Sequence, residues 1–396
     1  MSLRDVAVVG VYATRQARSI EDRTAFDLTL EAVRGALDDA GLSAGDVDGS
    51  CLAYPGPGGV SGDAGSWGRI FGHGLNYVAD GLLDTAGARG VLKAAAAVAS
   101  GICDVAVVGG ASASGTAVPG GGPDGLSGGV PAYGAGGAAI GGGEVWGGYV
   151  AANFALVAQR HMHEFGTTKE QMAQVAATIR NAGSANPEAV MFGRGPYTVQ
   201  DVLASRPVAT PFNLLDICLV AQGGACLVLT TAERARDLRQ PPVLVLGAAM
   251  EARRAAWTGN ADYRECRRLG AAASRRMFAM AGAEPGDVDV YCFYDPTSFE
   301  VIHCFEVLGL CGEGEGGPFV EDSGIAVGDR YPVNPDGGCL SYAWNGTQQM
   351  TLKLIEGVKQ LRGQAGGRQV ADCRLAVATN AGSASMHIEM ALLGRV

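Results

Sequence analysis

The chain has 396 residues, 47% of them hydrophobic, which is enough apolar surface for two fused cores of ordinary size. Its net charge of −10, without any cluster of Lys and Arg, argues against nucleic acid as a partner. No run approaches the roughly 18 apolar residues of a membrane span, and the start of the chain does not resemble a secretion signal, so we expect a soluble, cytoplasmic protein without a membrane partner.

The first expected element is an amphipathic helix that ends at Gly41, with Thr24 and Asp27 spaced as a capping box at its start. Residues 40–48 (AGLSAGDVD) recur as residues 281–289 (AGAEPGDVD), again after a helix. A strand is expected after each copy, and a second, β-branched strand later in each half. These strands cover residues 49–54, 105–108, 290–294 and 375–378. The repeat predicts two similar α/β halves that pack as a pseudo-dimer.

A glycine-rich stretch at residues 115–143 cannot form a conventional helix or central strand, so it is expected to be a loop. Helices are expected at 149–165 and 168–182, and we interpret the region up to Pro207 as a lid over the first half. His161 and His163 lie two positions apart on the first of these helices, so they cannot hold one metal ion together. We expect both at the surface or at an interface.

The ten cysteines are scattered singly, without a CxxC pair, which argues against a zinc site and against a disulfide framework. We interpret them as small core residues in a reducing compartment, and we predict no metal. His303 and His387 lie in segments typical of satisfied core or rim histidines.

Five stretches, taken together, resemble the thiolase superfamily, and within it the branch of sterol carrier protein X and the lipid-transfer proteins. The match covers nearly the whole chain. The resemblance implies a five-layered αβαβα fold, a homodimer formed through the thiolase half, and an acyl-CoA thioester bound where the two halves meet. The stretches are residues 158–167 (AQRHMHEFGT), 214–216 (LLD), 223–225 (GGA), 305–310 (FEVLGL) and 332–341 (PVNPDGGCLS).

On this basis the chain divides into two thiolase halves and one inserted region. Residues 1–114 with 205–245 form the N-terminal half, and residues 246–396 form the C-terminal half. Residues 115–204 are the inserted glycine-rich loop and helical lid.

The departures from the family pattern concern its chemistry. Asp84 occupies the position of the acyl-accepting cysteine and cannot form a thioester. Tyr294 and Trp344 occupy the positions of the two catalytic histidines, and Gly382 ends an Asn-Ala-Gly sequence where the family has Cys-x-Gly. A thiolase needs a thiolate nucleophile and a second cysteine for proton transfer, and neither is in place.

This pattern resembles the thiolase-fold aldolases that cleave steroid side chains at the coenzyme A thioester stage. The resemblance implies retro-aldol cleavage of a 17-hydroxy C22 acyl-CoA to a 17-ketosteroid and propionyl-CoA, without a covalent intermediate. No cofactor is implied, because coenzyme A is part of the substrate. The resemblance also implies a small companion protein with an OB-fold, which gives a heterotetramer.

We assign the proton transfers to Tyr294 and Tyr342, without deciding which is acid and which is base. A tyrosine can fill both roles if an adjacent donor or positive charge lowers its pKa from about 10. The backbone N–H of Gly382 is the expected donor to the enolate, and Trp344 is a candidate apolar wall for a steroid ring. Asp84 either orients a tyrosine or is a carboxylate at a helix N-terminus.

The sequence leaves two alternatives open. One is an acetyl-CoA acyltransferase or thiolase that uses a displaced cysteine such as Cys51 or Cys339. The other is a non-catalytic carrier of lipids or acyl-CoA.

Overall fold

The structure is a computed structural model that describes residues 2–52, 65–79, 85, 87–113, 150–253, 261–346 and 349–395. Its main sheet has nine strands in the order β3-β2-β4-β7-β1-β8-β11-β10-β9. These strands are β1 (Val6–Ala13), β2 (Gly49–Leu52), β3 (Tyr77–Val78), β4 (Val105–Ser112), β7 (Gly223–Thr231), β8 (Val243–Ala252), β9 (Val290–Cys292), β10 (Leu375–Gly382) and β11 (His387–Arg395). A separate hairpin consists of β5 (Pro207–Ala209) and β6 (Phe212–Asn213).

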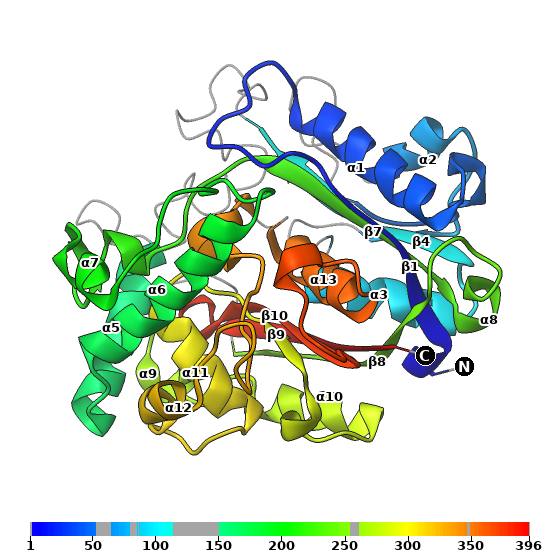
Figure 1. The fold of residues 1–396 in the computed structure, drawn as a ribbon. Coiled ribbons are helices and arrows are strands. Elements are labelled where there is room, and N and C mark those ends of the chain that lie inside the picture. Colours follow the sequence, from blue (N-terminus) through cyan, green and yellow to red (C-terminus); the bar gives the residue numbers. More distant parts are fainter. Residues whose placement is uncertain are drawn as a thin grey trace.

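The helices include two in the interior of the molecule, and the rest lie outside the sheet (Figure 1). The interior helices are α3 (Gly87–Ala99) and α13 (Gln349–Leu361). The others are α1 (Ala25–Ala40), α2 (Ser66–Phe71), α5 (Val150–Phe165), α6 (Lys169–Ala185), α7 (Val199–Ala204), α8 (Ala232–Ala235), α9 (Tyr263–Cys266), α10 (Ala271–Ala281), α11 (Ser298–Leu308) and α12 (Gly316–Ser323).

Five layers follow from the contacts between these elements. Helix α1 covers the outer face of β1, β4 and β7, and helix α10 covers the outer face of β8 and β11. Helices α3 and α13 contact strands of both sections of the sheet, so the sheet curves around them (Figure 1). The two sections join where β1 pairs with β8, at Ala7 opposite Leu244 and Val8 opposite Val243. The expected five-layered α/β fold is confirmed.

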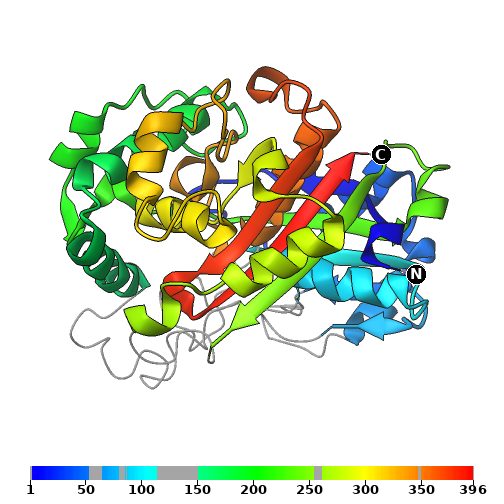
Figure 2. The same cartoon turned by 90° about the horizontal axis from the view of Figure 1, so that it is seen from below.

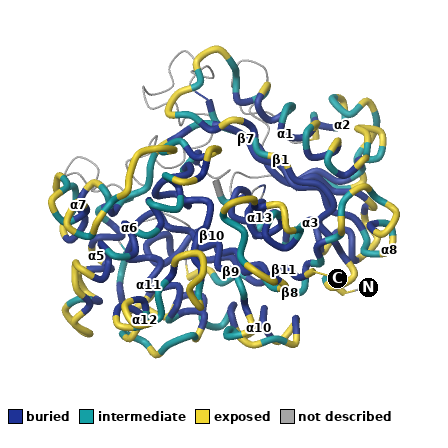
Figure 3. The backbone as a smooth tube through the Cα atoms, in the orientation of Figure 1, coloured by how far each residue is buried: buried dark blue, intermediate teal, exposed yellow. Residues whose placement is uncertain are grey.

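The strands and the interior helices are largely buried, and exposed residues lie mainly on the outer helices and loops (Figure 3). Within the described part of the chain, every helix is too short or too polar to cross a lipid bilayer.

The repeat is confirmed at both of its helix ends. Helix α1 begins at Thr24, whose side chain accepts the N–H of Asp27, and it ends at Gly41 with φ of 76°. Helix α10 ends in the same way at Gly282, with φ of 67°. Glycine adopts this left-handed conformation at little cost, so each helix stops at the same point of the repeat.

The last residue of each repeat copy connects two strands of its half. The carboxylate of Asp48 accepts the N–H of Val105 at 2.8 Å, at the start of β4. The carboxylate of Asp289 accepts the N–H of Leu375 at 3.0 Å, at the start of β10. The second strand of each half is thereby fixed beside the strand that comes directly after the repeat.

Helices α5 and α6 correct the expected location of the lid. Helix α6 packs against α11, α12 and the turn Gly338–Tyr342, and α5 contacts α9 and the turn Ser383–Ser385. These elements belong to the C-terminal half, so the helices pack mainly on that half (Figures 1 and 2), and their contacts with the predicted first half are to the segment directly after the insertion, β5 and the turn Leu214–Asp216. The sequence showed which face of each helix is apolar, but not which surface of the protein that face packs against.

The boundaries of the predicted regions stay predictions. The predicted boundary at residues 245 and 246 falls inside β8, which begins at Val243. The glycine-rich stretch at 115–143 lies outside the described residues.

Candidate active site

Tyr294 comes two residues after strand β9 and is 2% exposed. Its backbone N–H donates to Thr379 Oγ1 of the neighbouring strand β10 at 3.0 Å. Its phenol oxygen accepts the indole N–H of Trp344 at 3.4 Å. The structure therefore brings together the two residues that occupy the family's histidine positions.

Trp344 is held by the segment that precedes strand β7. The backbone N–H of Trp344 donates to the carbonyl of Leu219 at 3.0 Å, and its carbonyl accepts the N–H of Ala221 at 2.8 Å. The same segment reaches the other side of the site, because the N–H of Cys218 donates to the carbonyl of Pro296 at 2.9 Å. Trp344 and Tyr294 thus share one frame of backbone hydrogen bonds.

Asp295 fixes the turn Gly338–Tyr342 that leads to Trp344. Its carboxylate accepts the N–H groups of Cys339 at 2.8 Å and Leu340 at 3.3 Å. A side chain at Gly338, where φ is 57°, would place its Cβ 2.1 Å from Asp295 Oδ2. Only glycine allows the turn to approach the carboxylate this closely.

Lys353 of helix α13 neutralises this carboxylate. Its ammonium lies 2.7 Å from Asp295 Oδ1, and both side chains are buried. Burial is the largest single effect and lowers the pKa of Lys353, but Asp295, Cys339 and Asp336 together raise it by more, so the net direction is upward. The two residues form a charged pair inside the protein.

The surroundings of Tyr294 do not lower the pKa of its phenol. Burial raises that pKa well above its ordinary value, and the nearby groups of Cys218 and Cys339 raise it further. The hydrogen bond from Trp344 acts in the opposite direction but does not compensate. The phenol therefore keeps its proton at neutral pH, which is the protonation state from which a general acid starts.

Tyr342 lies in a different environment from Tyr294. It belongs to the apolar cluster that includes α3 and α13, whereas Tyr294 belongs to the cluster around α11. Burial raises the pKa of Tyr342, as do the carboxylates of Glu188 and Asp336, while Arg368 lowers it. Among the described residues, no hydrogen bond joins the two phenols.

Gly382 ends strand β10, and its N–H already has a partner. It donates to Ser385 Oγ at 2.9 Å. An enolate oxygen would therefore compete with this hydroxyl for the N–H. Asp84, the remaining predicted residue, lies outside the described part of the chain.

By the family resemblance, Asn380 of β10 stands at the family's cysteine position. Its side chain contacts the N-terminus of the interior helix α3. With its amide oxygen turned toward the helix, Asn380 accepts the N–H of Ala88. The N–H of Gly87 donates to Thr351 Oγ1 of α13 at 3.1 Å. Neutral amide and hydroxyl groups, and no thiol, hold the N-terminus of α3.

The comparisons with known proteins agree with this geometry. Residues 259–395 match the family described as thiolase C-terminal domain-like. The chain is 34% identical over 392 residues to the 17-hydroxy-3-oxo-4-pregnene-20-carboxyl-CoA lyase of Mycobacterium tuberculosis, an alignment that covers 90% of this chain and 91% of the relative. The chain belongs to the thiolase superfamily.

Other members of this superfamily are similar to nearly the whole chain. An acetyl-CoA acetyltransferase of Methanothermobacter thermautotrophicus is 32% identical over 400 residues, covering 98% of this chain and 99% of the relative. A solved structure described as Ltp2-ChsH2(DUF35) aldolase has a TM-score of 0.82 and 28% identity, covering 99% of this chain and 98% of that chain. Identity alone does not separate the two chemistries, because a lyase and a transferase match about equally well.

The cysteines of this thiolase-superfamily member bear on the displaced-nucleophile alternative. All ten are free cysteines, and Cys51 and Cys339, the two candidates for a displaced nucleophile, are both buried. Burial raises the pKa of Cys339 well above its ordinary value, and it raises that of Cys218, the thiol close to Tyr294, to about 12. A nucleophilic thiol needs the opposite shift, so the structure supports neither candidate.

His161 corrects a prediction. It is fully buried, its Nε2 lies 3.0 Å from Glu306 Oε1, and its Nδ1 accepts from Thr167 Oγ1 at 2.9 Å. Helix α6 and the adjoining C-terminal half cover this face, so His161 is not at the surface, whereas His163 is exposed; the sequence had placed both at the surface or at an interface. His303 and His387 are buried, as expected, but one ring nitrogen of each, Nδ1 of His303 and Nε2 of His387, makes no hydrogen bond with any described residue.

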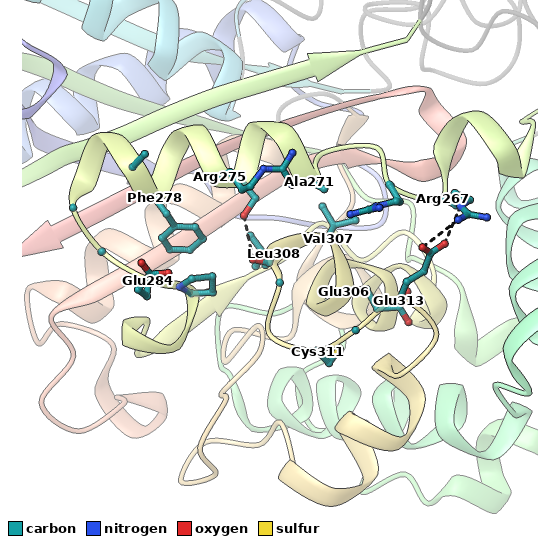
Figure 4. A pocket seen from close by; sticks show the side chains of 18 residues that line it. Arg267, Ala271, Arg275, Phe278, Glu284, Glu306, Val307, Leu308, Cys311 and Glu313 are labelled. Atoms are coloured by element: carbon teal, nitrogen blue, oxygen red, sulfur yellow. Dashed lines mark hydrogen bonds and ion pairs between the residues drawn. The ribbon is translucent and has the colours of Figure 1, made fainter.

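A hollow of about 600 Å³ lies on the outer side of the C-terminal half, between α10 and the connection from α11 to α12 (Figure 4). Arg267, Arg275, Phe278 and Leu308 are among its lining residues. None of the predicted site residues lines it, so this hollow is not the candidate active site.

Sequence reasoning missed two charged residues beside the site. Lys353 lies between apolar residues in the sequence LKLI, and Glu300 lies between apolar residues in the sequence FEVI. A charge inside a strongly apolar helical sequence is the signal that could have identified both, because such a charge must find a buried partner.

Proposed function

We propose that this protein is an aldolase that cleaves a steroid side chain at the coenzyme A thioester stage. The lyase class, acting on an acyl-CoA thioester, follows from its similarity to the mycobacterial lyase and the solved aldolase. We propose the 17-hydroxy C22 acyl-CoA as the substrate, and a 17-ketosteroid and propionyl-CoA as the products. The observation that carries the proposal is a buried tyrosine at the site of a thiolase fold whose nearby thiols resist ionisation.

The reaction needs no bond to the enzyme. A base takes the proton of the hydroxyl group, the bond between the carbinol carbon and the α-carbon breaks, and the carbinol becomes a ketone. The electron pair of the broken bond moves into the thioester, which becomes an enolate. An acid then protonates the α-carbon to give the shorter acyl-CoA.

Tyr294 and Tyr342 are the proposed acid and base. Both phenols keep their protons in the free protein, because burial raises both pKa values. This state supports the acid role directly, and the base role requires that one phenol lose its proton when substrate binds. Trp344 is proposed to line the ring pocket, and Gly382 to donate its N–H to the enolate after releasing Ser385.

Asp84 is proposed as a substrate-binding residue, and whether it orients a tyrosine or is a carboxylate at a helix N-terminus stays open. No separate cofactor and no metal are part of the proposed reaction.

We propose an assembly as well as an activity. The solved aldolase carries the name of a DUF35 partner, ChsH2. By this likeness, two copies of the chain pair through the thiolase half, and each binds a small OB-fold companion to give a heterotetramer. Size-exclusion chromatography with light scattering, with and without the companion, would test this arrangement.

Incubation with a 17-hydroxy C22 steroid acyl-CoA tests the function. We expect equal amounts of 17-ketosteroid and propionyl-CoA, and no labelled protein when the acyl chain carries an isotope. Acetyl transfer between CoA esters, with a trapped thioester on a cysteine, would instead identify a thiolase. Tight binding of acyl-CoA without any turnover, even with the companion, would identify a carrier.

A further inference from the structure

Glu300 is a fully buried carboxylate in the first turn of α11, and it has no part in the proposed proton transfers. It accepts the N–H of Ser383 at 3.0 Å and the hydroxyl of the same residue at 2.6 Å. It also lies against the backbone of Gly382, where an added Cβ would be 2.0 Å from Glu300 Oε1. The carboxylate therefore holds the turn at the end of strand β10.

His303 lies one helical turn further along α11 and faces the same carboxylate. Its Nε2 lies 3.1 Å from the carbonyl oxygen of Arg267. A carbonyl oxygen only accepts, so Nε2 must carry a hydrogen. The other ring nitrogen, Nδ1, lies 3.5 Å from Glu300 Oε1 and makes no hydrogen bond.

The contact between Nδ1 of His303 and the Glu300 carboxylate requires a further proton on the pair. If Nδ1 carried none, its lone pair would face the carboxylate oxygen, which is unfavourable in a buried site. A proton on Nδ1 turns the contact into an imidazolium–carboxylate pair, and a slight shortening would complete the hydrogen bond. The pair therefore holds one proton in addition to the one on Nε2.

We propose that Glu300 and His303 form a positioning pair that fixes the Gly382–Ser385 turn at the end of strand β10. Neither side chain is proposed to touch substrate, so both act through their neighbours. This inference rests on the proposed function only for its kinetic consequences, because the pair itself is a property of the free protein.

The charged and titratable groups around the pair support this arrangement. The charge of Glu300 influences the pKa values of Tyr294, Cys266 and Cys304 as well as that of His303, and the charge of Glu306 also influences that of His303. Burial is the largest single effect and lowers the pKa of His303, but the proximity of Glu300, the charge of Glu306 and the carbonyl of Arg267 together raise it overall. The negative charge of Glu300 also raises the pKa of Tyr294, after burial and the two thiols.

The first experiment measures the proton directly and needs no substrate. Nitrogen-15 NMR of histidine-labelled protein at about pH 8 distinguishes an imidazolium from either neutral tautomer. We expect an imidazolium signal that disappears in His303→Gln and becomes neutral in Glu300→Gln. A neutral His303 in the unmodified protein would overturn the proposal, whether or not the protein cleaves steroids.

The second experiment uses Glu300→Gln, which keeps the shape of the side chain and removes its charge. We expect kcat to fall by about 10- to 100-fold with a nearly unchanged KM, since the turn is displaced but substrate contacts remain. Ultraviolet titration, taken as the difference from the same variant carrying Tyr294→Phe, should show the phenol ionising at lower pH than in the unmodified protein. Glu284→Gln, on the exposed rim of the hollow in Figure 4, is the matched control and should change neither value.

Ser383→Ala keeps the proposal testable if Glu300→Gln does not fold. It removes one donor to the carboxylate and retains the charge, so we expect kcat to fall about 10-fold while the phenol titrates as before. The proposal is wrong if folded Glu300→Gln has both the kcat and the phenol titration of the unmodified protein. If Glu300→Gln does not fold, an unaltered kcat in Ser383→Ala would overturn the proposal instead. Absence of any cleavage by the unmodified protein would contradict the proposed function alone, because the histidine spectrum still decides the state of the pair.

Discussion

The two halves of the molecule share a repeat but differ in the residues that lie beyond it. In the first half, the strand after Asp48 is β2, which pairs with apolar or small residues of β4 on one side and with Tyr77 and Val78 of β3 on the other. In the second half, the strand after Asp289 leads directly to Tyr294 and Asp295, and a buried lysine and a buried glutamate lie beside them. The repeat builds the architecture, and the candidate chemistry lies where the second copy departs from the first.

The comparison within the second half is equally instructive. Tyr294 and Tyr342 are both buried phenols with raised pKa values, but only Tyr294 is hydrogen-bonded to Trp344. Tyr342 faces Glu188, Asp336 and Arg368. Equal burial therefore does not give the two residues equal surroundings.

The largest expected effect comes from breaking the buried ion pair that distinguishes the second half. Lys353→Met leaves Asp295 without its counter-charge, and we expect the free energy of unfolding to fall by about 3–5 kcal/mol in urea titrations. Lys359→Met, on the same helix, is the matched control. It breaks a partly exposed pair with Glu188 and should cost about 1 kcal/mol or less. Equal losses of unfolding free energy in the two variants would mean that the buried pair stabilises the fold no more than the partly exposed pair.

Tyr294→Phe tests which phenol carries the chemistry. The variant keeps the ring and should fold and bind acyl-CoA normally, yet lose at least about 10²-fold in kcat, the usual contribution of a general acid or base. Tyr342→Phe should show a loss of similar size if the two act as a pair. A near-normal rate in Tyr294→Phe, measured by release of propionyl-CoA, would remove Tyr294 from the mechanism.

Asp48→Ala and Asp289→Ala test whether the two repeat copies do the same structural work. Each removes the acceptor of backbone N–H groups at the start of a neighbouring strand, so we expect each to cost about 1–3 kcal/mol. The two values should agree within about 1 kcal/mol by thermal or urea unfolding. A much larger loss from one variant would show that the halves depend on the repeat unequally.

The smallest effect on kcat is expected from replacing the cysteines that a displaced-thiol mechanism would use as nucleophiles. Cys51→Ala and Cys339→Ala should leave kcat within about 3-fold of the unmodified rate, because both thiols are buried and burial raises the pKa of Cys339. Steady-state rates of both variants, normalised to folded protein, provide the measurement. A drop of two orders of magnitude in either would restore the thiolase alternative.

Local signals in the sequence were sufficient for much of the architecture. The capping box at Thr24 and Asp27 and the glycines at 41 and 282 act within one helical turn, so their role can be read without knowing the rest of the fold. The family resemblance then supplied the positions of Tyr294 and Trp344, and the structure shows that these two side chains meet. Their catalytic role stays a prediction.

Long-range contacts account for the features that the sequence did not reveal. Lys353 and Asp295 pair across two elements distant in the chain, and Glu300 meets Ser383 in the same way. His161 is buried because α5 and α6 pack on the C-terminal half, where Glu306 accepts from it. No periodicity within one helix specifies such a partner.

The sequence by itself determined the two α/β halves and the ends of their repeated helices. Through the family resemblance it also indicated that tyrosine and tryptophan stand in place of two histidines, and aspartate in place of a cysteine. These properties depend on residue identity and on spacing within a few positions. Only the tertiary structure decided which half the inserted helices cover, which charges are paired inside it and how the two phenols differ. Burial and electrostatic pairing depend on neighbours that the fold brings together from distant parts of the chain, and those neighbours set the pKa values on which the proposed chemistry depends.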